Sequence, residues 1–135
     1  MTLIADVKAL LLADATLMAS LTGGVHDAAE ISRQLTPGAF DANAELLPCA
    51  LIKTGTENAL ARKIEAVQTP LVIYFYQRSG YSAIDLALPR TYQLLEAQHF
   101  IGIWEIQFNT EIARTWDDAL KASLAVQRFN AIRKR

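Results

Sequence analysis

The first part of the chain has the apolar spacing of an amphipathic helix. Between residues 3 and 21, apolar side chains recur three and four positions apart, which is the spacing of one buried helix face. Thr2 can cap the start of this helix, and the pair Gly23 and Gly24 supplies the backbone freedom that ends it. Asp14 can also cap a second short helix. The segment therefore forms either one helix, or two helices with a break just before Asp14.

Two runs rich in β-branched and aromatic residues predict strands in the middle of the chain. They are Cys49–Thr54 and Pro70–Gln77, and the second is the strongest strand pattern in the sequence. Because its apolar run does not alternate, we expect both of its faces to be covered and the strand to lie centrally. The polar segment between the two runs, residues 55–69, is too long for a tight turn and predicts a projecting loop or hairpin arm.

A second amphipathic pattern at residues 81–98 predicts another helix, with Ser82 as its cap and Asp85 completing a capping box. Pro89 conflicts with an uninterrupted helix because it lacks an N–H donor and clashes with the preceding turn. We therefore expect a kink at Pro89, or two short helices of which the second begins there. The apolar stripe consists of Ile84, Leu88, Tyr92, Leu94 and Leu95.

The last third of the chain predicts two further strands. Residues 101–114 alternate almost ideally, so we expect one parity to face the core. Residues 124–135 form the final strand, in which the apolar positions share one register only if a bulge lies near Arg128. A polar connection, residues 115–123, joins the two. The core-facing set is Gly102, Trp104, Ile106, Phe108, Thr110 and Ile112.

This order of elements, with a short strand at Val25 and a long surface loop at residues 28–48, predicts an α+β fold. We expect a mixed, mainly antiparallel sheet with two main helices packed on one face, plus the projecting arm. A length of 135 residues, no repeat and no linker favour a single domain over residues 1–135.

Composition and charge narrow the classes of function. Hydrophobic residues make up 52% of the chain and charged residues 20%, which allows a buried core. A formal charge of −1 gives no electrostatic footprint for nucleic acid, although Arg133, Lys134 and Arg135 form a basic end. The charges at Asp6 and Lys8 argue against a signal peptide and against a helix that spans a membrane. We therefore expect a soluble protein.

Candidate catalytic and metal-binding groups are few. Cys49 is the single cysteine, which excludes an internal disulfide, and a half-buried apolar role is the simplest interpretation. His26, next to Asp27, has no evident nucleophile, and the pair Asp117 and Asp118 has no evident third ligand. We expect no cofactor and no metal. Should the protein be an enzyme, His26, Asp117 and Asp118 are the polar cluster to test.

The order of short motifs along the chain resembles the tail terminator, or tail-completion, proteins of long-tailed bacteriophages. The first helix ends in Asp14-Ala15-Thr16-Leu17 and runs into the glycine pair and a Val25-His26-Asp27 turn. A variable loop ends in Leu47-Pro48 before a strand. The later motifs are Tyr74-Phe75-Tyr76, Ser79-Gly80-Tyr81, Trp116-Asp117-Asp118 and Arg128-Phe129.

The resemblance implies a structural virion protein and not an enzyme. Members of that family form a ring, usually a hexamer, that caps the tail tube, ends its polymerisation and presents a surface for joining the head. The implied partners are copies of the chain itself, the tail tube protein and a head-closure or connector protein. DNA would pass through the lumen without specific binding, and no membrane is involved. Assembly would take place in the cytoplasm of a bacterial host.

Four residues are the expected contributors to subunit or partner contacts: Arg62, Lys63, Arg78 and Trp116. Arg62 and Lys63 lie in the arm. The resemblance implies that the arm and the 28–48 loop would both reach a neighbouring subunit or the adjoining ring. Trp116 lies in a polar connection. Two interpretations remain for its side chain: a contact in an interface, or packing in the core of its own chain. The main alternative function is a neighbouring neck component, a head-closure or head-tail adaptor protein. A nucleic-acid-binding module that uses residues 133–135 is a further alternative.

Overall fold

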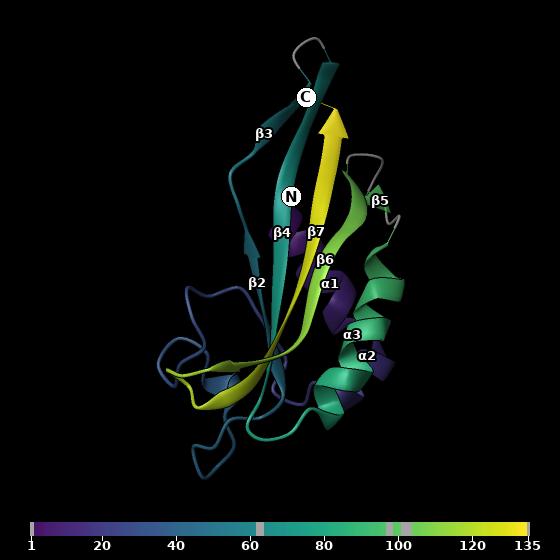
Figure 1. Cartoon of the computed structure of the whole chain (residues 1–135). Coiled ribbons are helices and arrows are strands. Elements are labelled where there is room, and N and C mark those ends of the chain that lie inside the picture. Colours follow the sequence, from purple (N-terminus) through teal and green to yellow (C-terminus); the bar gives the residue numbers. More distant parts are fainter. Residues whose placement is uncertain (1, 62–63, 97–98, 101–103, 135) are drawn as a thin grey trace.

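The protein is seen in a computed structural model that describes residues 2–61, 64–96, 99–100 and 104–134 (Figure 1). The helices are α1 (Leu3–Leu12), α2 (Ala15–Ser20) and α3 (Ser82–Leu95), with a short 3₁₀ turn at Pro37–Ala39. The strands are β1 (Val25–His26), β2 (Cys49–Thr54), β3 (Asn58–Ala61), β4 (Ile64–Gln77), β5 (His99–Phe100), β6 (Trp104–Asp117) and β7 (Ala122–Lys134).

The strands form one mixed sheet in the order β1-β2-β4-β7-β6-β5, with β3 paired to β4 beyond the end of β2. Strand β1 pairs with β2 in parallel, and the other described pairs are antiparallel. The expected α+β class is confirmed. Strand β4 is central, as its unbroken apolar run predicted, and it is longer than predicted because it includes the second half of the arm.

All three helices cover the same face of the sheet (Figure 1). Their apolar side chains pack against buried strand residues that include Ile73, Phe75 and Phe129. The break between α1 and α2 is confirmed: Asp14 caps α2 by accepting a hydrogen bond from the Leu17 backbone N–H at 2.9 Å. Asp14 also binds Arg90 of α3 at 2.6 Å, which ties the two helices together.

Helix α3 differs from the sequence prediction in its cap and in its continuity. The side chain of Gln77, at the end of β4, accepts hydrogen bonds from the backbone N–H groups of Ala83 and Ile84. The predicted capping box was therefore wrong, because an amide from the preceding strand caps this helix. The helix also continues through Pro89, so the prediction of two short helices was wrong. Packing against the sheet outweighs the lost backbone hydrogen bond.

Pro70 lies inside the central strand, where a proline is normally excluded because it cannot donate to a neighbouring strand. Its carbonyl accepts from the Gly55 N–H at 2.9 Å, on the side where β2 has ended and β3 has not begun. The missing N–H therefore faces this gap in the ladder. A Cβ at Gly55 would lie 3.1 Å from Pro70 Cγ, so glycine allows the close approach.

The irregularity that we placed near Arg128 lies in the partner strand. Strand β7 pairs with β4 without a shift from Ala66 and Lys134 to Gln77 and Ser123. The register shifts fall in β6, between Phe108 and Thr110 and between Ile112 and Thr115. The face predicted for β6 is consequently correct at Ile106, which is buried, and wrong at Ile112, which is 43% exposed.

Residues 28–48 were expected to be a surface loop. With Asp27 they form the 27–48 segment, most of which is exposed or half-buried and which also covers the second face of the sheet. Ile31 and Ala39 are buried against Cys49, Leu51 and Tyr76. This segment therefore forms a small second core on its own sheet. The predicted 115–123 connection is also shorter than expected, because Trp116 and Asp117 belong to β6 and the turn is confined to residues 118–121.

Candidate functional site

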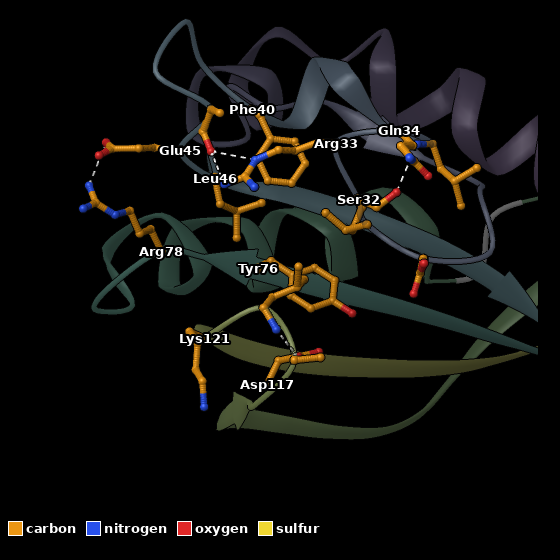
Figure 2. Close-up of a pocket in the computed structure, with 16 residues that line it drawn as sticks. Ser32, Arg33, Gln34, Phe40, Glu45, Leu46, Tyr76, Arg78, Asp117 and Lys121 are labelled. Carbon is orange, nitrogen blue, oxygen red and sulfur yellow. Dashed lines mark hydrogen bonds and ion pairs between the residues drawn. The ribbon is translucent and has the colours of Figure 1, made fainter.

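An open groove lies between the 30–46 segment and the turn that joins β6 to β7 (Figure 2). Its volume is about 750 Å³. We call it the loop groove. Its large apolar side chains are Ile31, Leu35, Phe40, Leu46, Tyr76 and Leu120, and its charged side chains are Glu30, Arg33, Glu45, Arg78, Asp117 and Lys121. Acids and bases are equal in number, so the groove has no strong preference for a charged ligand.

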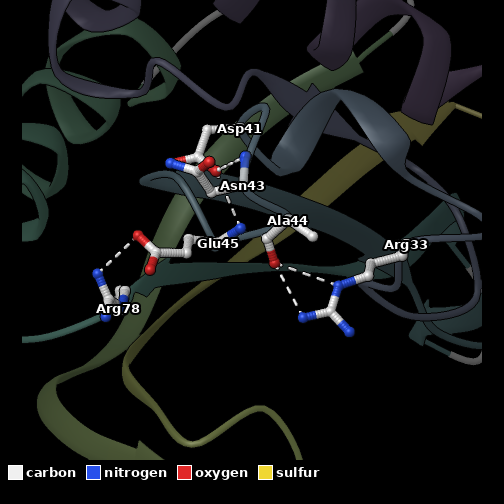
Figure 3. Close-up of polar contacts among 6 residues, drawn as sticks. All are labelled: Arg33, Asp41, Asn43, Ala44, Glu45 and Arg78. Atoms are coloured by element: carbon white, nitrogen blue, oxygen red, sulfur yellow. Dashed lines mark hydrogen bonds and ion pairs between the residues drawn. The ribbon is translucent and has the colours of Figure 1, made fainter.

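One wall of the groove is held in shape by a turn around Ala44 (Figure 3). The Asp41 carboxylate accepts hydrogen bonds from the N–H groups of Asn43 at 2.8 Å and Glu45 at 3.0 Å. Ala44 adopts a positive φ of 59°, and its carbonyl accepts two hydrogen bonds from the Arg33 guanidinium. These side-chain contacts add to backbone hydrogen bonds of the same turn, in which the Asp41 N–H donates to the Glu45 carbonyl and the Ala44 N–H to the Asp41 carbonyl, both at 2.9 Å.

Arg78, one of the predicted interface residues, lies on the rim of the loop groove. Its guanidinium is 2.9 Å from the Glu45 carboxylate, and both side chains are largely exposed. An exposed ion pair of this kind contributes about 0–1 kcal/mol. It connects the end of β4 to the 30–46 segment, and the Arg78 side chain stays 62% exposed.

Trp116, another of the four predicted interface residues, is 52% exposed and lies opposite Ser123 in the β6–β7 pair. The chain's own core therefore leaves about half of this side chain uncovered. Trp116 is not part of the lining of the loop groove, so the structure does not gather it with Arg78. Arg62 and Lys63 lie outside the described residues. The interface role of all four residues stays a prediction.

His26, Asp117 and Asp118, the polar residues to test for an enzyme, each make a contact within a local turn. His26 Nε2 is 2.6 Å from the Gly23 carbonyl oxygen, which closes the glycine turn. Asp117 accepts from the Leu120 N–H at 2.9 Å, and Asp118 pairs with Lys121 at 3.4 Å. Across residues 2–61, 64–96, 99–100 and 104–134, no group of three or more His, Cys, Asp or Glu side chains is placed to hold a metal ion.

Cys49 is fully buried in the small core under the 27–48 segment. Burial without a charged partner raises the pKa of its thiol to about 12. The thiol is therefore protonated at neutral pH and packs as a small apolar side chain.

The loop groove and the cap that Gln77 gives to α3 were not predicted from the sequence. The alternating polar positions Asp41, Asn43 and Glu45 form a side-chain-stabilised turn pattern that could have indicated an ordered wall. Nothing in the sequence indicated that Tyr76 would form the floor, since this requires knowing which segment covers that face of β4.

Within the part of the chain that the structure describes, the helices are too short or too polar to cross a lipid bilayer.

Comparisons with known proteins find a likeness in structure. No protein-family model matches the chain, and no curated protein sequence matches it. A solved structure described as the virion of a native gene transfer agent (GTA) particle contains a chain that is similar, with a TM-score of 0.70 and 16% sequence identity. The match covers 98% of this chain and 95% of that chain, so the two share a whole fold.

Proposed function

We propose that this chain is a structural subunit of a phage-like particle, and specifically a tail terminator that forms a ring on the end of the tail tube. The observation that carries the proposal is the shared fold with a chain of a gene transfer agent virion, over nearly the full length of both chains. The motif order in the sequence adds independent support, since it resembles that of tail terminators.

The distribution of polar groups fits a structural role better than an enzymatic one. His26, Asp117 and Asp118 each hold a local turn, and the Cys49 thiol is buried and protonated. The described residues do include surfaces that a partner could cover, among them the loop groove and the exposed Trp116. A protein that acts by assembling needs such surfaces and needs no catalytic site.

The proposed assembly is a ring, usually a hexamer in the tail terminator family, that binds the tail tube protein on one side and a head-closure or connector protein on the other. Repetition around the ring lets modest contacts add up through avidity. A formal charge of −1 is consistent with DNA passing through the lumen without specific binding. A neighbouring neck protein is the alternative, and the partner ring distinguishes the two.

The first experiment measures the mass of the purified chain by light scattering and native mass spectrometry, followed by negative-stain imaging with tail tubes of the same particle. A closed ring, alone or on tube ends, supports the terminator. A chain that binds connector rings and never caps tubes supports the neck alternative. A chain that stays monomeric and binds neither contradicts both.

Charge reversal at Arg62 and Lys63 tests the role of the arm. We expect the double variant Arg62→Glu and Lys63→Glu to fold normally and to cap tubes poorly, because a charge reversed within an interface opposes association. Unchanged capping, with an unchanged melting temperature, would count against contacts made by the arm.

A further inference from the structure

The loop groove contains a polar group without a partner in the chain. Tyr76 is 7% exposed and forms part of the groove lining (Figure 2). Among the described residues, its hydroxyl has no hydrogen-bond partner, whereas Tyr81 donates to the Thr115 carbonyl at 2.6 Å. Because Tyr76 lines an open groove, this hydroxyl is free to donate to water or to an acceptor that enters the groove.

Two exposed apolar side chains lie on the helix side of the sheet. Gln77, Ser123 and Trp116 are cross-strand neighbours, and Gln77 caps α3, so Trp116 lies on the helix side. Leu86 of α3 is 65% exposed. We call Trp116 and Leu86 the helix-side knob.

Helix α3 and β6 are linked near the knob by an ion pair. The Arg114 guanidinium is 2.7 Å from the Asp85 carboxylate, and it also lies over the ring of Tyr81. This contact joins the start of α3, which carries Leu86, to the strand that carries Trp116. The two apolar side chains are therefore presented by connected elements.

The groove and the knob are unlike surfaces that lie back to back. Asp117, the residue after Trp116, lines the groove, because successive strand residues point to opposite faces. Figure 1 shows α3 and the 27–48 segment on opposite sides of the sheet. Because the two surfaces lie on opposite faces, one two-fold contact does not readily use both at once, and a head-to-tail arrangement of copies is favoured; such contacts form a ring when the rotation closes.

The chemistry of the groove favours this chain over nucleic acid as the occupant. Its rim has three acidic and three basic side chains, so it lacks the positive charge that a phosphate backbone requires. Its apolar floor and volume of about 750 Å³ suit a large apolar side chain. Tryptophan is the residue type most enriched at the centre of interfaces.

We propose that Trp116 of one copy inserts into the loop groove of the next copy, with Leu86 at the rim and the Tyr76 hydroxyl donating to a backbone carbonyl of the inserted segment. This contact rests on the proposed ring assembly and specifies how one subunit meets the next.

A complementation experiment tests the contact. Trp116→Ala removes the knob, and Leu35→Glu places a charge on the groove lining at a side chain that is 53% exposed. We expect each variant alone to stay monomeric in light scattering. An equimolar mixture should form heterodimers, because the groove of the first variant and the knob of the second are intact. Ile112→Ala, which truncates an exposed β6 residue outside both surfaces, should still form rings.

Tyr76→Phe removes only the hydroxyl. We expect an unchanged melting temperature and an increase of about five-fold in the concentration needed for half assembly, since a hydrogen bond contributes about 1 kcal/mol. A lower melting temperature with unchanged assembly would mean that the hydroxyl serves the fold and not the contact.

The possible failures are distinguishable. If the wild-type chain forms rings and both variants do too, or if the mixture gives no heterodimer, the knob contact is wrong and the ring stands. If the wild-type chain is monomeric in solution, a photo-cross-linking residue at position 116 decides: cross-links to the groove segments of a second copy support the contact. Cross-links to other surfaces overturn it, and no intermolecular cross-link, with or without tail tubes, contradicts both proposals.

Discussion

The two faces of the sheet are covered in different ways. Among the residues whose burial the structure describes, the three helices cover a cluster of nineteen on one face, whereas the 27–48 segment covers five on the other. The helix side gains its stability from apolar area that recurs with helical spacing. The loop side depends on a few side-chain hydrogen bonds, such as those of Asp41 and Arg33. The regular face carries most of the fold, and the irregular face shapes the groove.

The sharpest test of this difference is a matched pair of core truncations. Leu71 on the helix side and Leu51 on the loop side are both buried in neighbouring strands. We expect Leu71→Ala to lower the free energy of unfolding by about 3–5 kcal/mol, and Leu51→Ala by about 2–3 kcal/mol, because an irregular segment can collapse into the space. Urea denaturation measures both, and equal losses would show that the loop side is packed as rigidly as the helix side.

Removing the Asp41 carboxylate should affect the loop side alone. Asp41→Ala leaves two backbone N–H groups without their acceptor, and we expect a loss of about 1 kcal/mol together with faster proteolytic cleavage between residues 27 and 48. Asp118→Ala is the matched control, since its pair with Lys121 is almost fully exposed and should contribute little. Unchanged cleavage in the Asp41 variant would mean that apolar burial and backbone hydrogen bonds order the segment without this carboxylate.

The helix side contains a contact that depends on pH. The hydrogen bond from Arg90, helped by the Leu17 N–H, lowers the pKa of Asp14 from 3.8 to about 2. Because the folded pKa is depressed, this stabilisation is complete above about pH 4 and is lost as pH falls towards 2. We expect the difference in melting temperature between wild type and Asp14→Asn to be constant near neutral pH and to close within that window. A difference that stays constant to pH 2 would contradict this role.

The smallest expected effect has the opposite sign. Thr91 of α3 is fully buried, and its hydroxyl has no partner among the described residues. Thr91→Val removes this unpaired group at nearly constant volume, so we expect a gain of up to about 1 kcal/mol in the free energy of unfolding. A clear loss of stability would show that an ordered water satisfies the hydroxyl.

Much of the regular structure was predictable from local patterns. The bounds of β2 agree with the sequence prediction, and the break before Asp14 was anticipated from its capping side chain. Errors arose where a distant residue decided the outcome. Gln77 caps α3 from another element, and packing on the sheet keeps α3 intact through Pro89. A single-chain pattern does not specify such partners.

The candidate site was less predictable than the fold. Arg78 and Trp116 were singled out by residue type and position, but their different surroundings, a groove rim and an exposed strand on the opposite face, were not foreseen. The groove exists because the 30–46 segment and the β6–β7 turn meet over Tyr76. These segments are far apart in the sequence and have no shared periodicity.

The sequence by itself determined the α+β class, the central place of β4 and the amphipathic faces of the helices, because helical and strand spacing of apolar residues is a local property. Only the tertiary structure decided that β6 carries the register shifts, that the 27–48 segment closes the second face, and that Trp116 and the groove lie back to back. Each of these depends on which distant segments pack together, and that is set by the summed burial of the whole chain.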